Sequence, residues 1–465
     1  MNQNLTEGNP QRVLWRFSLP MFISVIFQQL YNIADSMIAG RFAHNGEEAL
    51  AAIGASYPIT MIFMAIAVGS NIGCSVVISH LFGAKRYRDL KTAVSTTIIA
   101  SLVLSLVLTV LGLAFNGSMM TWIQTPTNIF DDGKLYLGIY IGGFVFLFLY
   151  NVCTGIFQSL GDSKTPLYFL IGSSVGNILL DWLFVAVFHW DVAGVAWATF
   201  LAQGIACVLA LFALLRRMKG ISVPQPATRF SFAMLWEIAR IAIPSILQQS
   251  FVSVGNILIQ GLINSCGSAV IAGYSAAVKL NTFTITSFTT LANGVSSFTA
   301  QNMGAGKHDR VKAGFRSGLL MAFIVAIPFF VVLFFFSNNM IGLFMSDEGQ
   351  KAMDTGVSFL RMVTPFYFIV SIKLIADGVL RGAGAMISFM ISTFTDLILR
   401  VILSFILFKP LGTTGIWLSW PIGWTIAMFV SVGFYLSGHW KKVRMQGDAS
   451  PESEETKSDM QPVSP

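Results

Sequence analysis

Long hydrophobic segments recur along almost the whole chain, and no other feature restricts its fold so strongly. Between Val13 and Gly438 they repeatedly exceed the roughly 20 residues that an α-helix needs to cross a bilayer. Of the 465 residues 54% are hydrophobic and only 11% charged, whereas soluble domains carry about 25% charged residues. The sequence therefore predicts an all-α integral membrane protein.

Breaker residues divide the hydrophobic sequence into twelve predicted transmembrane helices, six in each half of the chain. They cover residues 14–39, 49–80, 93–115, 134–159, 166–189, 193–215, 235–262, 269–300, 313–337, 354–380, 386–408 and 414–438. The predicted parts are an N-terminus (1–12), an N-terminal lobe (13–218), a linker (219–233), a C-terminal lobe (234–440) and a tail (441–465). We expect the tail to be disordered because it is polar, acidic and free of aromatic residues.

The distribution of basic residues predicts the orientation in the membrane. Most of the 29 lysine and arginine residues lie near the termini or in loops on one side, whereas only Arg41, Lys134, Lys351 and Lys409 lie in the opposite loops. By the positive-inside rule both termini are cytoplasmic. The net charge of +7 is spread over loops that would face anionic lipid, so it indicates no nucleic-acid partner.

The two halves resemble each other at an offset of 221 to 224 residues. An even number of spans in each half makes the repeats parallel, related by a pseudo-twofold axis along the membrane normal. This geometry predicts two six-helix lobes with a cleft between them. The matching pairs are Pro20 with Pro244, Asn32 with Asn256, Gly73 with Gly294, Gly83 with Gly304, Lys91 with Lys312, and Gly194 with Gly415.

Three simpler signals are missing from the sequence. The N-terminal segment has no short apolar core with a small-residue cleavage site, so we expect no cleaved signal peptide. The four cysteines are scattered without a CxxC pair, which indicates neither a disulfide framework nor a zinc site. We therefore expect no metal and no cofactor.

Charged side chains inside the C-terminal half need partners, because a charge at the middle of a bilayer costs roughly 2.5–3.5 kcal/mol on insertion scales. Asp396 and Arg400 are four residues apart on one helix, which favours a structural ion pair. Lys373 and Asp377 have the same spacing, so they form a pair or contact a substrate or ion in the cleft. Lys279 has no carboxylate within four residues; it either extends to the membrane surface or meets Asp377.

A second polar group belongs to the N-terminal half. Asp35 and Asp181 have no basic residue within four positions, and Asn177 and Thr199 should lie at a similar depth. Two carboxylates in a low-dielectric site share a proton or hold a cation, although a hydrogen-bonded structural network is an alternative. Pro20 removes a backbone hydrogen bond from the same helix as Asp35, which predicts a kink or hinge.

Several motifs together resemble the multidrug and toxic compound extrusion family of transporters. They are QLYNIADSMIAG, EALAAIGASYP, GAKRYRD, LGDSKTP, and GNILLDWLF followed by AGVAWAT, and the resemblance covers about residues 10–440. It implies efflux of cationic amphipathic compounds driven by protons or sodium ions. In the DinF-like branch the ion-coupling positions match Asp35, Asn177, Asp181 and Thr199.

The resemblance to other branches is weaker. A NorM-like glutamate is missing from the core of the seventh span, where Glu237 lies only at the cytoplasmic edge, so Asp377 is the one plausible remnant of that site. A lipid-linked precursor flippase has the same architecture and is the alternative function. Gly161-Asp162 lacks the upstream glycine of an intramembrane aspartyl protease motif, so we expect no enzyme. We expect a monomer in the bacterial cytoplasmic membrane.

Overall fold

The computed structural model describes residues 4–42, 46–344 and 349–443; for residues 33–37, 39–42 and 46–50 only the backbone is described. Throughout these ranges the regular secondary structure is helical. The first half contains α1 (Pro10–Phe42), α2 (Gly46–Gly83), α3 (Tyr87–Trp122), η1 (Thr127–Ile129), α4 (Phe130–Gly142), α5 (Phe144–Ser159), α6 (Lys164–Asp181), η2 (Trp182–Val187) and α7 (Asp191–Lys219). The second half contains α8 (Phe232–Asn264), α9 (Ser268–Gly304), α10 (His308–Phe335), α11 (Ser337–Gly342), α12 (Gln350–Val363), η3 (Thr364–Phe366), α13 (Tyr367–Gly382), α14 (Met386–Leu411), α15 (Thr413–Leu436) and η4 (His439–Lys442).

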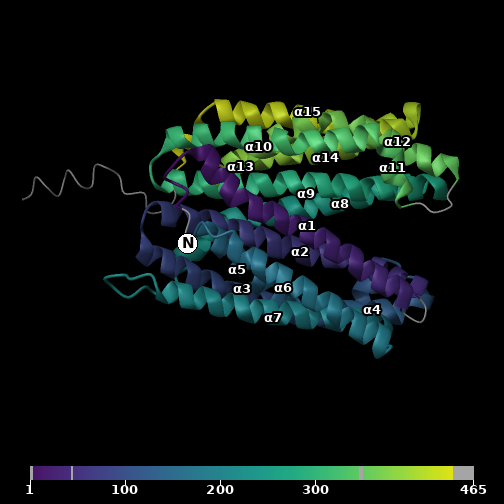
Figure 1. Cartoon of the computed structure of the whole chain (residues 1–465), viewed down its shortest axis with the longest axis horizontal. Coiled ribbons are helices and arrows are strands. Elements are labelled where there is room, and N and C mark those ends of the chain that lie inside the picture. Colours follow the sequence, from purple (N-terminus) through teal and green to yellow (C-terminus); the bar gives the residue numbers. More distant parts are fainter. Residues whose placement is uncertain (1–3, 43–45, 345–348, 444–465) are drawn as a thin grey trace, which may run out of the picture.

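The helices form two bundles, an N lobe of α1–α7 and a C lobe of α8–α15 (Figure 1). Each lobe supplies six of the twelve transmembrane segments that the sequence predicts. Three segments are composite: α4 and α5 meet at a bend of 46°, α6 continues into η2, and α12 continues through η3 into α13. η4 reaches into the predicted tail, of which residues 444–465 lie outside the described part.

One transmembrane helix is less apolar than the others. Length and hydropathy single out ten described helices and the bent α4–α5 pair as able to cross a membrane, but not α9. α9 contacts α1 and α2 of the N lobe and α10, α12 and α13 of its own lobe. Because α9 is surrounded by protein, its many serine, threonine and asparagine side chains do not have to face lipid.

Glycines permit close contact between the lobes, and the contacts obey the internal symmetry. A Cβ atom on Gly83 would overlap the backbone of Gln301, and one on Gly304 would overlap the backbone of His80. Gly83 and His80 match Gly304 and Gln301 at the same offset of 221 residues. Each lobe therefore presents the same patch to the other, as in a twofold-symmetric dimer.

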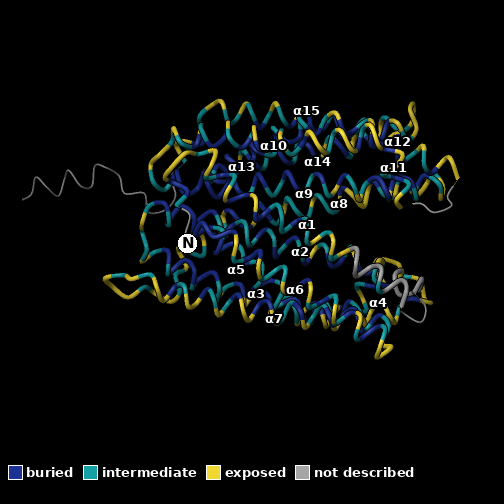
Figure 2. The backbone as a smooth tube through the Cα atoms, in the orientation of Figure 1, coloured by how far each residue is buried: buried dark blue, intermediate teal, exposed yellow. Residues whose placement is uncertain are grey.

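A second glycine pair repeats this arrangement farther along the same helices. Gly73 on α2 would clash with Ala242 if it had a Cβ atom, and the matching Gly294 on α9 would clash with Ser18. Both sets of contacts lie toward the end of the bundle that carries residue 4 and the turns 84–86 and 305–307, here called the basic end. Toward this end almost all residues of α2 and α9, which contact each other, are buried (Figure 2).

Candidate functional site

The N lobe brings together part of the polar group expected from the sequence. Asn177 and Asp181 lie one turn apart on α6 and are 2% and 0% exposed. The Asn177 Nδ2 atom donates a hydrogen bond to Thr199 Oγ1 on α7 at 3.4 Å. The side chain of Asp35 lies outside the described residues, but its helix α1 packs against α6, η2 and α7. The described part of the group is therefore a buried polar site between α6 and α7, beside α1.

The backbone changes its winding immediately after Asp181. Residues Trp182–Val187 form the π-helix η2, in which the wider turn leaves the regular α-helical hydrogen-bond pattern. Such π-helical turns are rare and often occur at functional sites. The irregular backbone thus begins next to the buried carboxyl group.

Pro20 is buried inside α1, which is assigned as one continuous helix through it. The Ser24 hydroxyl donates a hydrogen bond to the Pro20 carbonyl oxygen at 2.9 Å. A proline followed by this serine bond weakens the local helix ladder and favours bending. Pro244 occupies the matching position in α8, so both lobes begin with a helix of this kind.

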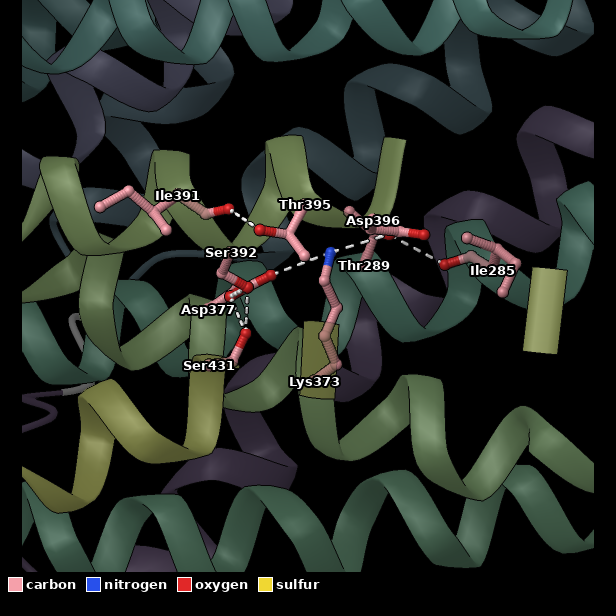
Figure 3. A network of polar contacts seen from close by, with 9 residues as sticks. All are labelled: Ile285, Thr289, Lys373, Asp377, Ile391, Ser392, Thr395, Asp396 and Ser431. Carbon is pink, nitrogen blue, oxygen red and sulfur yellow. Dashed lines mark hydrogen bonds and ion pairs between the residues drawn. The ribbon is translucent and has the colours of Figure 1, made fainter. Parts of the chain in front are cut away.

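The C lobe contains a buried ion network centred on Lys373. Its Nζ atom is 3.1 Å from Asp377 Oδ2 and 3.6 Å from Asp396 Oδ2 (Figure 3). The contact with Asp377 is the pair expected from the four-residue spacing on α13. The contact with Asp396 joins α13 to α14, so one ammonium group contacts two carboxylates.

Two serines hold the other oxygen of Asp377. Ser392 on α14 donates to Asp377 Oδ1 at 3.0 Å, and Ser431 on α15 donates to the same atom at 2.6 Å (Figure 3). Three helices therefore fix this carboxylate, whose residue is 4% exposed. No sequence spacing singled out Ser431, whereas Ser392 lies one turn from Asp396 on the face that meets α13.

The prediction of an ion pair between Asp396 and Arg400 is wrong. Asp396 instead faces Lys373, and the Arg400 guanidinium lies over the indole of Trp420, 4.4 Å from the ring centroid. A planar guanidinium gains from stacking on an aromatic face, while the lysine on α13 can reach both carboxylates. Within the described part, Asp396 Oδ1 and Arg400 Nε have no hydrogen-bond partner.

Arg381 is a third buried cation, which the sequence assigned to a loop. It lies at the last turn of α13, four residues beyond Asp377, and is 5% exposed. Its Nη2 atom donates to Asn293 Oδ1 on α9. The regular spacing of Lys373, Asp377 and Arg381 on one helix was the available signal.

Charged side chains of both signs are buried in the C lobe. Three cations, Lys373, Arg381 and Arg400, lie on α13 and α14 with the carboxylates Asp377 and Asp396. Glu237 on α8 is a third buried carboxylate. Among the described residues of this lobe, buried cations and buried carboxylates are therefore equal in number.

Lys279 is not part of this network. Its side chain is exposed on α9, and its Nζ atom lies 5.9 Å from the ring centroid of Phe344. The structure therefore does not place Lys279 against Asp377, the partner considered from the sequence.

A cavity of about 790 Å³ opens between α8 and α14 near the basic end. Its wall includes Trp236, Met386 and Met390 together with the charged side chains of Glu237 and Arg240. Cavities of this size accept drug-sized molecules, and aromatic and methionine side chains adapt to varied apolar ligands.

Charged side chains buried inside two repeated helical lobes define a polytopic membrane protein of the transporter class. The family model MatE matches the chain twice, over residues 20–183 and 244–406, once in each lobe. The chain belongs to the MatE family of transporters. The double match also reproduces the internal repeat found in the sequence.

Individual relatives agree with this assignment. Two proteins of Bacillus subtilis, the probable multidrug resistance proteins YpnP and YoeA, are 26% and 27% identical to the chain. The alignments cover 95% and 94% of this chain and 98% and 96% of those proteins. A solved MOP superfamily transporter from Pyrococcus furiosus has the same fold, with a TM-score of 0.88 at 23% identity, over 95% of this chain and 99% of that one.

Proposed function

We propose that the protein exports cationic amphipathic small molecules from a bacterial cell in exchange for an inward-moving proton or sodium ion. The names of the Bacillus relatives, which describe multidrug resistance, support export of drug-like compounds. The cavity beside Trp236 supports amphipathic substrates, because it combines apolar walls with the charged side chains of Glu237 and Arg240.

The coupling cation binds in the N lobe, at Asp35, Asn177, Asp181 and Thr199. The observation that carries this assignment is the complete burial of Asp181 beside the Asn177–Thr199 hydrogen bond. A negative charge on a fully buried carboxylate is costly, and binding of a proton or a cation removes or balances that charge.

In the transport cycle the ion enters the N lobe from the end opposite the basic end, and α1 bends near Pro20. The lobes rock against each other, so that the symmetric glycine contacts form when the basic end is closed and separate when it opens. The substrate is thereby exposed alternately to each side. The basic end faces the cytoplasm, so both termini are cytoplasmic, and one chain is sufficient for the cycle.

Transport by the full chain in proteoliposomes tests this proposal. Ethidium movement is measured under an imposed proton or sodium gradient for the parent, Asp35→Asn, Asp181→Asn and the control Asp354→Asn, whose carboxylate is exposed on α12. We expect one gradient to drive the parent and the control, and gradient-driven transport to fall at least tenfold in the two N-lobe variants. Undiminished transport in both variants refutes the coupling assignment. No drug transport, with complementation of a flippase-deficient strain, would favour the flippase.

A further inference from the structure

The segment before α1 belongs to the N lobe in sequence but lies on the C lobe. Its residues 4–9 are here called the strap. Leu5 is completely buried in the hydrophobic core that the two lobes share. Its amide N donates to Gln301 Oε1 at 3.1 Å, and its carbonyl accepts a hydrogen bond from Asn302 Nδ2 at 3.2 Å. The end of α9 therefore binds the backbone of the strap on both sides of one residue.

Arg310, at the start of α10, holds three successive parts of the strap. Its Nη2 atom donates to the carbonyls of Leu5 and Glu7 at 3.2 and 3.1 Å, and its Nη1 atom donates to the Gly8 carbonyl at 2.6 Å. Its Nε atom donates to Asn302 Oδ1 at 3.0 Å, which orients the guanidinium. One side chain thus satisfies three carbonyl groups.

The strap is attached where the two lobes touch. Gln301 Oε1 accepts the hydrogen bond from the Leu5 amide. Its Nε2 atom donates a second hydrogen bond, at 2.7 Å, to the Ser159 carbonyl at the end of α5. The same residue is the one whose backbone approaches Gly83. Lys307, in the adjacent turn, adds a hydrogen bond to the Thr6 carbonyl at 2.9 Å. If the lobes separate at this end, Gln301 cannot keep both its strap and its α5 partners.

The linker before α8 makes the symmetry-related contact: it binds the N lobe, but more weakly than the strap binds the C lobe. Arg88 at the start of α3 donates to Gln225 at 2.9 Å, and the Ser231 amide donates to Thr96 at 3.1 Å. Each lobe is therefore preceded by a segment that contacts the opposite lobe. Gln225 is exposed, whereas Leu5 is fully buried, so the strap is the stronger of the two attachments.

We propose that the strap is a latch that holds the lobes together at the basic end, with Arg310 as its principal holding residue. The role rests on the alternating-access cycle proposed above. Removal of Arg310 leaves the carbonyls of Leu5, Glu7 and Gly8 without a charged donor, so the closed arrangement loses several hydrogen bonds that the open one does not make. The latch sets how readily this end opens to substrate.

Distances between spin labels on the full chain in lipid nanodiscs test the latch. The labels replace Lys91 and Lys312, which the internal repeat relates, after substitution of the four native cysteines. We expect a single distance in the parent, and at least a tenfold rise in the ratio of longer-distance (open) to parent-like (closed) populations in Arg310→Met. Arg316→Met is the matched control on the same helix, because Arg316 is exposed, and it should resemble the parent.

A second variant separates opening from misfolding. Leu5→Asp keeps Arg310 but places a charge in the buried pocket, and we expect it to open the same end while retaining a monodisperse elution profile. Parent-like distances in both Arg310→Met and Leu5→Asp refute the latch. The distances do not depend on ion coupling, so the latch stands if coupling fails, and coupling stands if the distances do not change.

Discussion

Replacement of Lys373 by methionine tests whether two buried carboxylates depend on one ammonium group. Lys373 Nζ is 3.1 Å from Asp377 Oδ2 and 3.6 Å from Asp396 Oδ2, and the lysine side chain is 4% exposed. Methionine is a similarly long, unbranched side chain, so the substitution removes chiefly the charge. The carboxylates then remain buried without their shared cation.

The expected magnitude follows from these distances. At an effective dielectric constant of about 20, attraction over 3.1 or 3.6 Å is on the order of 5 kcal/mol for each pair. Desolvation of the lysine offsets part of it, and loss of one partner from a buried ion pair destabilises proteins by about 3–5 kcal/mol. We expect Lys373→Met to lower the free energy of unfolding by roughly this amount. Neutralising Asp377 in the same chain should restore part of the loss.

Equilibrium unfolding in detergent, followed by tryptophan fluorescence, measures the effect. The parent, Lys373→Met, Asp377→Asn and the double variant form a mutant cycle, in which contacting residues show a coupling energy. Lys312→Met is the matched control, because Lys312 pairs with Asp309 at 2.8 Å on the exposed surface and should contribute little. Equal effects of Lys373→Met and Lys312→Met, or strict additivity in the cycle, would contradict the reasoning.

Two further predictions concern the lobe contact and acid stability. Gly83→Ala would force a Cβ atom into the facing α9 backbone, so we expect it to lower the free energy of unfolding by about 1–3 kcal/mol. Gly433→Ala is the control: its Cβ atom meets open space, so this substitution should be neutral or slightly stabilising. A larger loss in Gly433→Ala would overturn the assignment of close contact. Burial of Asp162, in the loop before α6, opposes ionisation, but hydrogen bonds from Thr165 and Arg217 outweigh it and lower the pKa of Asp162. Its stabilisation should be full above pH about 4 and be lost as the pH falls through the lowered pKa, so acid melts of Asp162→Asn should be flatter; identical pH profiles would refute this.

The candidate site shows which kinds of contact a sequence can predict. The pair of Lys373 and Asp377 was predictable because a four-residue spacing on a helix places both side chains on one face. The same rule failed for Asp396 and Arg400, because each found a better partner on another helix. Ser431 joins the network from α15, at a sequence distance of 54 residues from Asp377, and no local spacing could reveal it.

The sequence by itself determined the membrane class, the two repeated halves and the residues that carry unusual polarity, because bilayer thickness and helix periodicity act on contiguous segments. Even α9 was recognised as a span, although its hydropathy is low. Only the tertiary structure decided which helices touch. It placed Gly83 against Gln301 and Asp396 beside Lys373, and it placed Leu5 on the opposite lobe. These pairings depend on packing between segments far apart in the chain, where the free energy of burial outweighs local preference.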